Sequence, residues 1–226
     1  MKKPLEVLRL YPEHDYTLNG VLASRAGRDP ARPFIVFRER SRSWGEFSQA
    51  VDAAARVLAA RGIGRGDRMA VMARNCDGHV LLLFALARLG AIMVPVNPEF
   101  GVGEAKYVLH HAEVSAVAAT ADTLEVARKA AAGLQTPAWF VMLDAAAADA
   151  PALDDLLKTA PAADLPRGIS GDDTCLIVYT SGTTGFPKGA MHSQRSFVTG
   201  GEAFVQRVYL QDNDRVMIVL PMFHIN

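Results

Sequence analysis

Short apolar runs recur along this chain, and most are followed by a longer segment of helical character. A run of four or five apolar residues between turn residues is typical of a strand that is buried on both faces of a sheet. Such runs span residues 69–73, 92–96, 115–119 and 139–143. Segments of helical character follow the first three runs, at residues 77–89, 104–112 and 122–132. This alternation predicts an α/β fold with mostly parallel sheets flanked by helices.

Turn and capping residues predict further elements around this pattern. Residues 34–37 and 40–43 are expected to form a small hairpin. Ser43 and Glu46 have the spacing of a capping box for a helix that runs to Arg61 and stops at Gly62. Residues 144–168 are rich in Ala, Asp and Pro, and we interpret them as a surface connection that is helical only over residues 153–159.

This connection is expected to divide the chain into two parts. Residues 1–168 would form a first α/β subdomain with an N-terminal extension, and residues 169–226 a second, incomplete subdomain. The second part is predicted to run strand, loop, helix, strand. The strand covers residues 175–179, the helix residues 192–208 and the last strand residues 215–220.

The loop of this second part reads Tyr-Thr-Ser-Gly-Thr-Thr-Gly-Phe-Pro-Lys-Gly over residues 179–189. Glycines let backbone amides turn toward an anion, hydroxyls add donors, and a lysine supplies a mobile positive charge. A Walker A loop has glycine before its lysine and Ser or Thr after it, whereas Pro187 and Gly189 flank Lys188 here. Nor do the glycines from residue 62 onward complete a dinucleotide fingerprint, because Asp67 stands at the last glycine position. The loop therefore predicts a polyphosphate site of another kind, with a solvated surface turn as the alternative.

The same run closely resembles the signature of the adenylate-forming superfamily, which includes acyl-CoA synthetases, aryl-CoA ligases, luciferases and peptide-synthetase adenylation domains. Other segments are similar to motifs of that family, so the resemblance covers most of the chain from about Phe34 onward. They are Ser-Trp-Gly-Glu-Phe at residues 43–47, the glycine turn at residues 62–70, the stretch from Leu89 to Pro98, and Pro-Met-Phe-His at residues 221–224.

The resemblance implies that the chain is part of the large N-terminal domain of an adenylate-forming enzyme. It implies two half-reactions, in which an acid and ATP give an acyl-adenylate and pyrophosphate, and the acyl group then passes to a thiol, usually that of coenzyme A. Lys188 is expected to pair with the departing pyrophosphate, and His224 is a candidate wall of the acyl or nucleotide pocket, with a structural histidine as the alternative. The phosphate-cradling role carries over to Thr180, Ser181, Gly182, Thr183, Thr184 and Gly185.

The resemblance also implies that the rest of the site lies downstream of this chain. In the family, the adenine-binding residues, the glutamate that holds Mg²⁺, the ribose-binding aspartate and the catalytic lysine all follow the last matching motif. No catalytic residue is therefore assigned, and the ligand of Mg²⁺ is expected beyond Asn226. We expect the chain to be an N-terminal portion that is inactive alone.

Among adenylate-forming enzymes, Ala-Met-His-Ser at residues 190–193 favours a CoA ligase acting on a fatty or related organic acid. Gln194 and Arg195 stand where many relatives have a further histidine or asparagine, which weakens assignment to a subfamily. Two alternatives stay open. One is an adenylation domain that loads a carrier protein, and the other is a non-catalytic nucleotide-binding or interaction module.

Composition and spacing argue against other classes of function. The formal net charge is +0 and no basic run stands out, so a nucleic-acid partner is not expected. The longest apolar helix candidate, residues 80–89, is too short to span a bilayer. Cys76 and Cys175 lie far apart without metal or redox spacing, which indicates reduced thiols in a cytoplasm. The expected partners are a small carboxylic acid, ATP and CoA, and a homodimer is compatible with the sequence.

No metal site is predicted from the histidines or aspartates. His110 and His111 are neighbours and would point about 100° apart on a helix, so they cannot share one ion. Asp172 and Asp173 precede a strand and fit a solvated turn.

Overall fold

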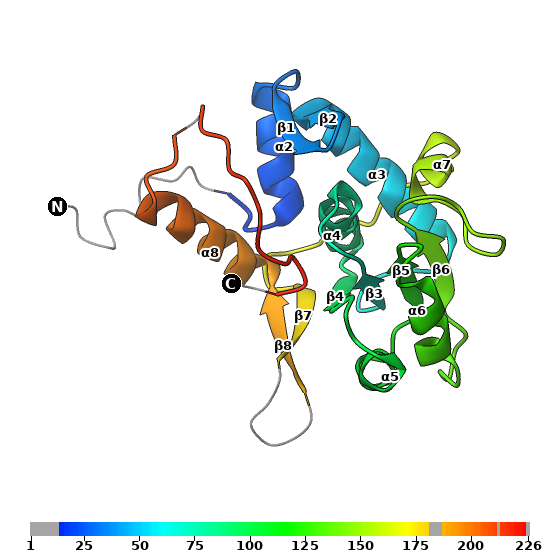
Figure 1. Ribbon diagram of the computed structural model, residues 1–226. Coiled ribbons are helices and arrows are strands. Elements are labelled where there is room, and N and C mark those ends of the chain that lie inside the picture. Colours follow the sequence, from blue (N-terminus) through cyan, green and yellow to red (C-terminus); the bar gives the residue numbers. More distant parts are fainter. Residues whose placement is uncertain (1–13, 181–186, 212, 225–226) are drawn as a thin grey trace.

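Figure 1 shows the computed structural model, which describes residues 14–180, 187–211 and 213–224. Six strands form one sheet in the order β6-β5-β3-β4-β7-β8, and β1 and β2 form a separate hairpin. The strands are β1 (Pro33–Phe37), β2 (Arg40–Ser43), β3 (Arg68–Met72), β4 (Ile92–Val96), β5 (Ala116–Ala119), β6 (Trp139–Met142), β7 (Thr174–Thr180) and β8 (Lys188–Ser193). The described helices are α2 (Leu18–Arg28), α3 (Trp44–Ala60), α4 (Asp77–Leu89), α5 (Val102–His111), α6 (Leu124–Ala131), α7 (Leu153–Lys158) and α8 (Gln194–Arg207).

Most of the large sheet is parallel, as the alternation predicts. β3 pairs in parallel with β4 and β5, β5 with β6, and β4 with β7. Parallel neighbours need a crossover connection, and α4, α5 and α6 lie within the connections from β3 to β6. The predicted fold class is therefore confirmed.

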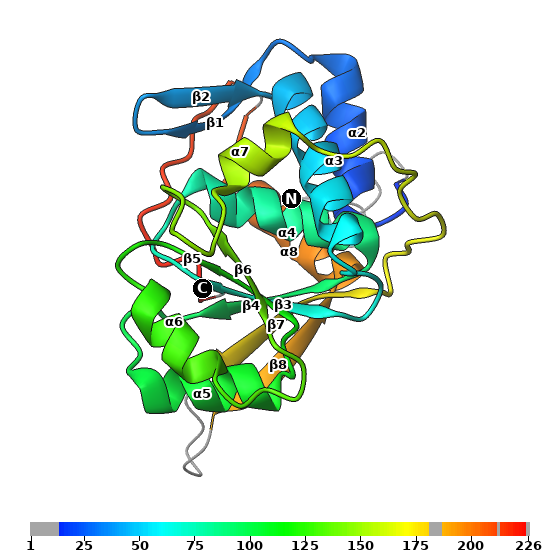
Figure 2. The same ribbon diagram turned by 90° about the vertical axis from the view of Figure 1, so that its right-hand side faces the viewer.

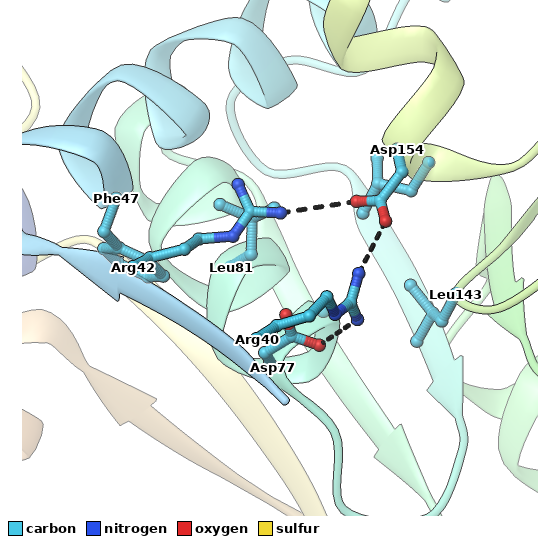
Figure 3. A pocket seen from close by; sticks show the side chains of 9 residues that line it. Arg40, Arg42, Phe47, Asp77, Leu81, Leu143 and Asp154 are labelled. Carbon is cyan, nitrogen blue, oxygen red and sulfur yellow. Dashed lines mark hydrogen bonds and ion pairs between the residues drawn. The ribbon is translucent and has the colours of Figure 1, made fainter. Parts of the chain in front are cut away.

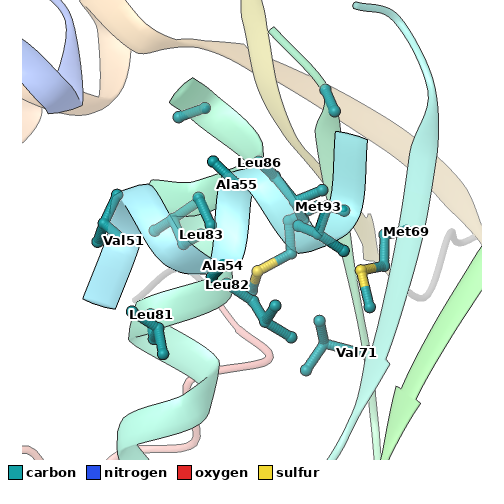
Figure 4. Packing of buried hydrophobic residues seen from close by; sticks show 14 of the residues in the cluster. Val51, Ala54, Ala55, Met69, Val71, Leu81, Leu82, Leu83, Leu86 and Met93 are labelled. Carbon is teal, nitrogen blue, oxygen red and sulfur yellow. The ribbon is translucent and has the colours of Figure 1, made fainter. Parts of the chain in front are cut away.

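The strands are buried on both faces because helices cover both. In β3, Met69 and Val71 belong to one apolar cluster, and Ala70 and Met72 belong to the other. Figure 2 shows α3 and α4 on one side of the sheet and α5 and α6 on the other. Figure 4 shows Met69, Val71 and Met93 facing the helices of the first cluster. This double burial is why the strands read as continuous apolar runs.

Two helix ends follow the sequence prediction closely. The Glu46 amide donates to Ser43 Oγ at 3.2 Å, and the Ser43 amide donates to Glu46 Oε2 at 2.7 Å, which completes the capping box at the start of α3. α4 spans the predicted residues 77–89, and its C-cap is Gly90, whose φ is +68°. A Cβ at Gly90 would lie 2.9 Å from Ile169 Cδ1 and 3.0 Å from Arg65 Cγ, so close packing as well as backbone geometry requires glycine there.

Gln194 joins three helices through one buried side chain. It is 0% exposed and is the first residue of α8. Its Oε1 accepts a hydrogen bond from the amide of Leu18 in α2 at 3.0 Å, and its Nε2 donates to the carbonyl of Ala87 in α4 at 3.2 Å. The residue that departs from many relatives thus has a structural role in this chain.

The second part of the chain differs from the prediction in two elements. A strand that is not predicted, β8, lies between the loop and the predicted helix and pairs antiparallel with β7. The helix itself is confirmed as α8, which begins at Gln194 and ends at Arg207, close to the predicted residues 192–208. As the last strand in the order, β8 has one neighbour and leaves Met191 71% exposed, so its apolar periodicity is weak. Residues 215–220 form no strand. Their apolar side chains are exposed, and within the described sheets no strand pairs with them to satisfy their backbone groups.

The connection over residues 144–168 contains α7 as its described helix, close to the predicted range. β7 and β8, which follow it, hydrogen-bond into the same sheet as β3 to β6. The division of the chain at residues 168 and 169 stays a prediction. Across the described ranges, the helices are too short or too polar to cross a membrane.

Candidate functional site

The candidate site lies where parallel strands end at one edge of the sheet. β3, β4 and β7 run in the same direction, so the segments that follow them gather at their carboxyl ends, which is where open α/β sheets bind ligands. Thr180 is the last residue of β7 and Lys188 is the first residue of β8. The two residues are cross-strand partners and both are exposed. The structure therefore brings together two residues of the predicted phosphate loop.

The other predicted loop residues lie outside the described part of the chain. They are Ser181, Gly182, Thr183, Thr184 and Gly185. Their phosphate-binding roles stay predictions.

Tyr179 anchors the first stem of the loop, by which we mean the end of β7 that leads into the loop. Its hydroxyl lies 2.7 Å from Nδ1 of His111 on α5, and the two rings meet edge to face at 5.7 Å. Gly189, opposite Tyr179, makes room for this ring, since a Cβ there would lie 2.9 Å from Ile177 Cγ2 and 3.2 Å from Tyr179 Cζ. Burial, together with the nearby Tyr107 hydroxyl, raises the pKa of Tyr179 to about 12, so its phenol stays protonated at neutral pH.

Tyr107 anchors the second stem, which leads out of the loop into β8. Its hydroxyl donates to the carbonyl of Pro187, directly before Lys188, at 3.1 Å. Its ring stacks on His111 at 5.4 Å with an interplanar angle of 24°. The sequence prediction for His111 concerns only its pairing with His110 and does not include Tyr107. The informative signal is the four-residue spacing of Tyr107 and His111, which places both side chains on one helix face.

The segment that carries His224 is held at the same edge by Asn75. Asn75 follows β3, and its Nδ2 donates to the carbonyl of Leu220 at 2.8 Å. The amide of Met222 donates to Asn75 Oδ1, also at 2.8 Å. His224 is exposed, and its ring centroid lies 5.1 Å from that of Phe223. His224 thus lies in a segment anchored to the residue after β3, while its contact with substrate stays a prediction.

Charged residues at this edge pair with one another. Arg74, after β3, forms ion pairs with Glu99 at 2.6 Å and with Asp122 at 3.6 Å. Groups of three or more His, Cys, Asp or Glu side chains placed to hold a metal ion do not occur within the described ranges. The described residues thus do not by themselves supply a ligand set for Mg²⁺.

Two hollows lie elsewhere, and neither has Thr180 or Lys188 in its lining. The first is a cavity of about 10 Å³, room for about one water, beside a charged cluster. In that cluster Arg40 bridges Asp77 at 2.7 Å and Asp154 at 2.6 Å, and Arg42 reaches Asp154 at 3.4 Å (Figure 3). These ion pairs connect the β1–β2 hairpin to α4 and α7. The second hollow is a groove of about 700 Å³ between α2, α3, the end of α4 and residues 163–169.

A family model described as AMP-binding enzyme matches residues 22–226. The chain belongs to the AMP-binding enzyme family. AMP-binding enzymes are the adenylate-forming proteins that the sequence motifs indicate, so the family assignment is confirmed.

Named relatives in the AMP-binding family are CoA ligases and synthases. The chain is 31% identical over 183 residues to the long-chain-fatty-acid CoA ligase FadD13 of Mycobacterium tuberculosis, covering 81% of this chain and 36% of that protein. It is 32% identical over 222 residues to a sulfoacetate CoA ligase of Cupriavidus necator, covering 96% of this chain and 43% of that protein. It is 34% identical over 202 residues to a feruloyl-CoA synthase of an Amycolatopsis species, covering 88% and 38%. The chain thus spans about two fifths of the length of these relatives.

Solved AMP-binding structures share the fold. A Rhodopseudomonas palustris protein described as a long-chain-fatty-acid CoA ligase matches with a TM-score of 0.85 and 25% identity, over 93% of this chain and 53% of that chain. The inhibitor-bound N-terminal domain of FACL13 from Mycobacterium tuberculosis matches with a TM-score of 0.80 and 28% identity, over 92% and 52%. The observed layers are therefore those of CoA ligase N-terminal domains.

Proposed function

We propose that the protein to which this chain belongs is an ATP-dependent carboxylic acid–CoA ligase. It would convert an acid and ATP to an acyl-adenylate and pyrophosphate, and then transfer the acyl group to the thiol of CoA. Family membership and the names of the relatives support this proposal. Those names span fatty, sulfonated and aromatic acids, so they support the ligase class more strongly than a fatty or related organic acid as substrate.

The observation that carries the proposal is the pairing of Lys188 with Thr180 at the carboxyl edge of the sheet. A carboxylate that attacks the α-phosphate of ATP approaches a group of its own charge, so the site must neutralise charge and fix geometry. The Lys188 ammonium would stabilise the negative charge of the departing pyrophosphate. The Thr180 hydroxyl and the amides and hydroxyls of residues 181–185 would bind the phosphate oxygens.

The remaining groups have more limited roles in the proposal. His224 would form part of the wall against which the acid or the nucleotide packs. Bound Mg²⁺ would neutralise phosphate charge, and its protein ligand is proposed to lie outside this chain. The proposed location is the cytoplasm, where ATP and CoA are both present.

We further propose that the 226-residue chain is inactive alone, because the relatives it matches have more than twice its length. Acid-dependent exchange of pyrophosphate into ATP would be measured for this chain and for any longer product of its gene. The proposal predicts exchange by the longer product and none by the 226-residue chain. Exchange by the shorter chain would refute its inactivity, and no exchange by the longer product with any of a graded set of acids would refute the ligase assignment.

A further inference from the structure

We infer that Tyr107 and His111 are positioning residues that hold Thr180 and Lys188 in place for the phosphates of ATP. The inference rests on the proposed function and deepens it. Neither Tyr107 nor His111 is proposed to touch the nucleotide. Both act from α5, through Tyr179 and Pro187, on the residues that would touch the nucleotide. We call the set Tyr107, His111, Tyr179 and Pro187 the aromatic clasp.

The end of the β7–β8 hairpin needs support from outside the sheet. β4 pairs with β7 at Met93 and Leu176, whereas β7 continues to Thr180. β7 and β8 pair up to Thr180 and Lys188, and Figure 1 shows the end of this two-stranded hairpin extending past the other strands. An isolated two-stranded ribbon is marginally stable in water. Thr180 and Lys188 stand at its end, where fluctuation would be largest.

From α5, Tyr107 and His111 reach both sides of the hairpin, next to Thr180 and Lys188. His111 bonds to Tyr179, which immediately precedes Thr180, and Tyr107 bonds to Pro187, which immediately precedes Lys188. Each stem is thereby fixed one residue away from its functional side chain. A residue that only filled space in the core would not need to hold both stems separately.

The platform that carries the clasp is rigid. Ala105, Val108 and Leu109 of α5 are at most 1% exposed and pack in the second apolar cluster. Tyr107 and His111 stack on each other, and both meet the Tyr179 ring nearly at right angles, at 89° and 88°. Aromatic contacts of this kind restrict ring motion and add to the two hydrogen bonds. The two stems are therefore held to the apolar core through α5.

Hydrogen–deuterium exchange at backbone amides, measured on the full-length protein that carries this chain, tests the clasp without relying on activity. Tyr107→Phe and Tyr179→Phe each remove one hydroxyl and keep the ring. We expect exchange at residues 179, 180, 188 and 189 to rise at least about threefold, the effect of losing one hydrogen bond. The matched control is Tyr209→Phe, since Tyr209 is 82% exposed. Unchanged exchange in both clasp variants would overturn the inference.

Steady-state kinetics on the same proteins tests the positioning role. Each clasp variant should raise the KM for ATP about three- to tenfold and leave the KM for CoA unchanged. His111→Phe combined with Tyr179→Phe should be no worse than either single change, because both remove the same bond. Faster amide exchange with an unchanged KM for ATP would overturn the positioning role. If the unmodified protein lacked acid-dependent pyrophosphate exchange, the proposed function and the nucleotide role would both fall, and amide exchange would still decide whether the clasp fixes the stems.

Discussion

Replacing Gln194 by leucine should destabilise the protein strongly although leucine is apolar and similar in size. Gln194 is 0% exposed and bonds to the Leu18 amide at 3.0 Å and to the Ala87 carbonyl at 3.2 Å. The Leu18 amide is in the first turn of α2 and has no partner within that helix, so the variant leaves a buried donor unsatisfied.

The magnitude follows from the two lost bonds. An unsatisfied buried donor costs about 1–3 kcal/mol. The Ala87 carbonyl also accepts a hydrogen bond from the Gly90 amide at 3.2 Å. Removing its bond to Gln194 therefore costs less, about 0.5–1.5 kcal/mol. The two losses add to about 1.5–4.5 kcal/mol, which lowers the melting temperature by about 3–18 °C for a chain of this size.

Thermal unfolding followed by circular dichroism measures this loss. The matched control is Gln135→Leu, which makes the same change at an exposed position in a turn and should shift the melting temperature by less than about 2 °C. If Gln194→Leu melted within about 2 °C of the unmodified protein, the view that Gln194 satisfies buried backbone groups of α2 and α4 would be wrong.

Three further predictions concern buried and exposed side chains. Burial lowers the pKa of His79 from 6.5 to about 4, so the stability that its neutral form provides is complete above pH 6.5 and is lost as the pH falls toward 4. Urea unfolding across this range should show a loss of about 3 kcal/mol that is absent from His79→Leu. Burial raises the pKa of the Cys175 thiol to about 12, so a maleimide at pH 8 should modify Cys175 only after unfolding, and rapid labelling of the native protein would contradict this. Residues 216–220 are 57–83% exposed and all apolar, so the 226-residue chain should self-associate with rising concentration. Ile218→Lys should weaken that association in sedimentation experiments, and equal association would locate the contact elsewhere.

The parts of the fold that the sequence predicts well are those in which one physical cause dominates. β3 to β6 are buried on both faces, so their apolar runs are unambiguous. The capping box at Ser43 depends on local chemistry that one sequence contains in full.

The parts of the structure that the sequence does not predict depend on contacts between distant segments. β8 is a half-exposed edge strand whose pairing with β7 leaves little apolar alternation. α2 is capped by Thr17, and its first amide, that of Leu18, donates to Gln194, which lies 176 residues further along the chain. In the candidate site, Thr180 and Lys188 follow from the motif, whereas the role of Tyr107 depends on the fold that brings α5 to Pro187.

Pyrophosphate exchange by a Lys188→Met variant of the full-length protein tests the central claim most directly. Methionine keeps most of the side-chain length and removes the charge that is proposed to face the departing pyrophosphate. Loss of such a stabilising group costs about 10²-fold or more in rate, so acid-dependent exchange should fall by at least that factor. Lys129→Met is the matched control, because Lys129 is 61% exposed and pairs with Glu125 on α6, and it should retain full exchange. Full exchange by Lys188→Met would contradict the assignment of this loop as the phosphate-binding element of a ligase.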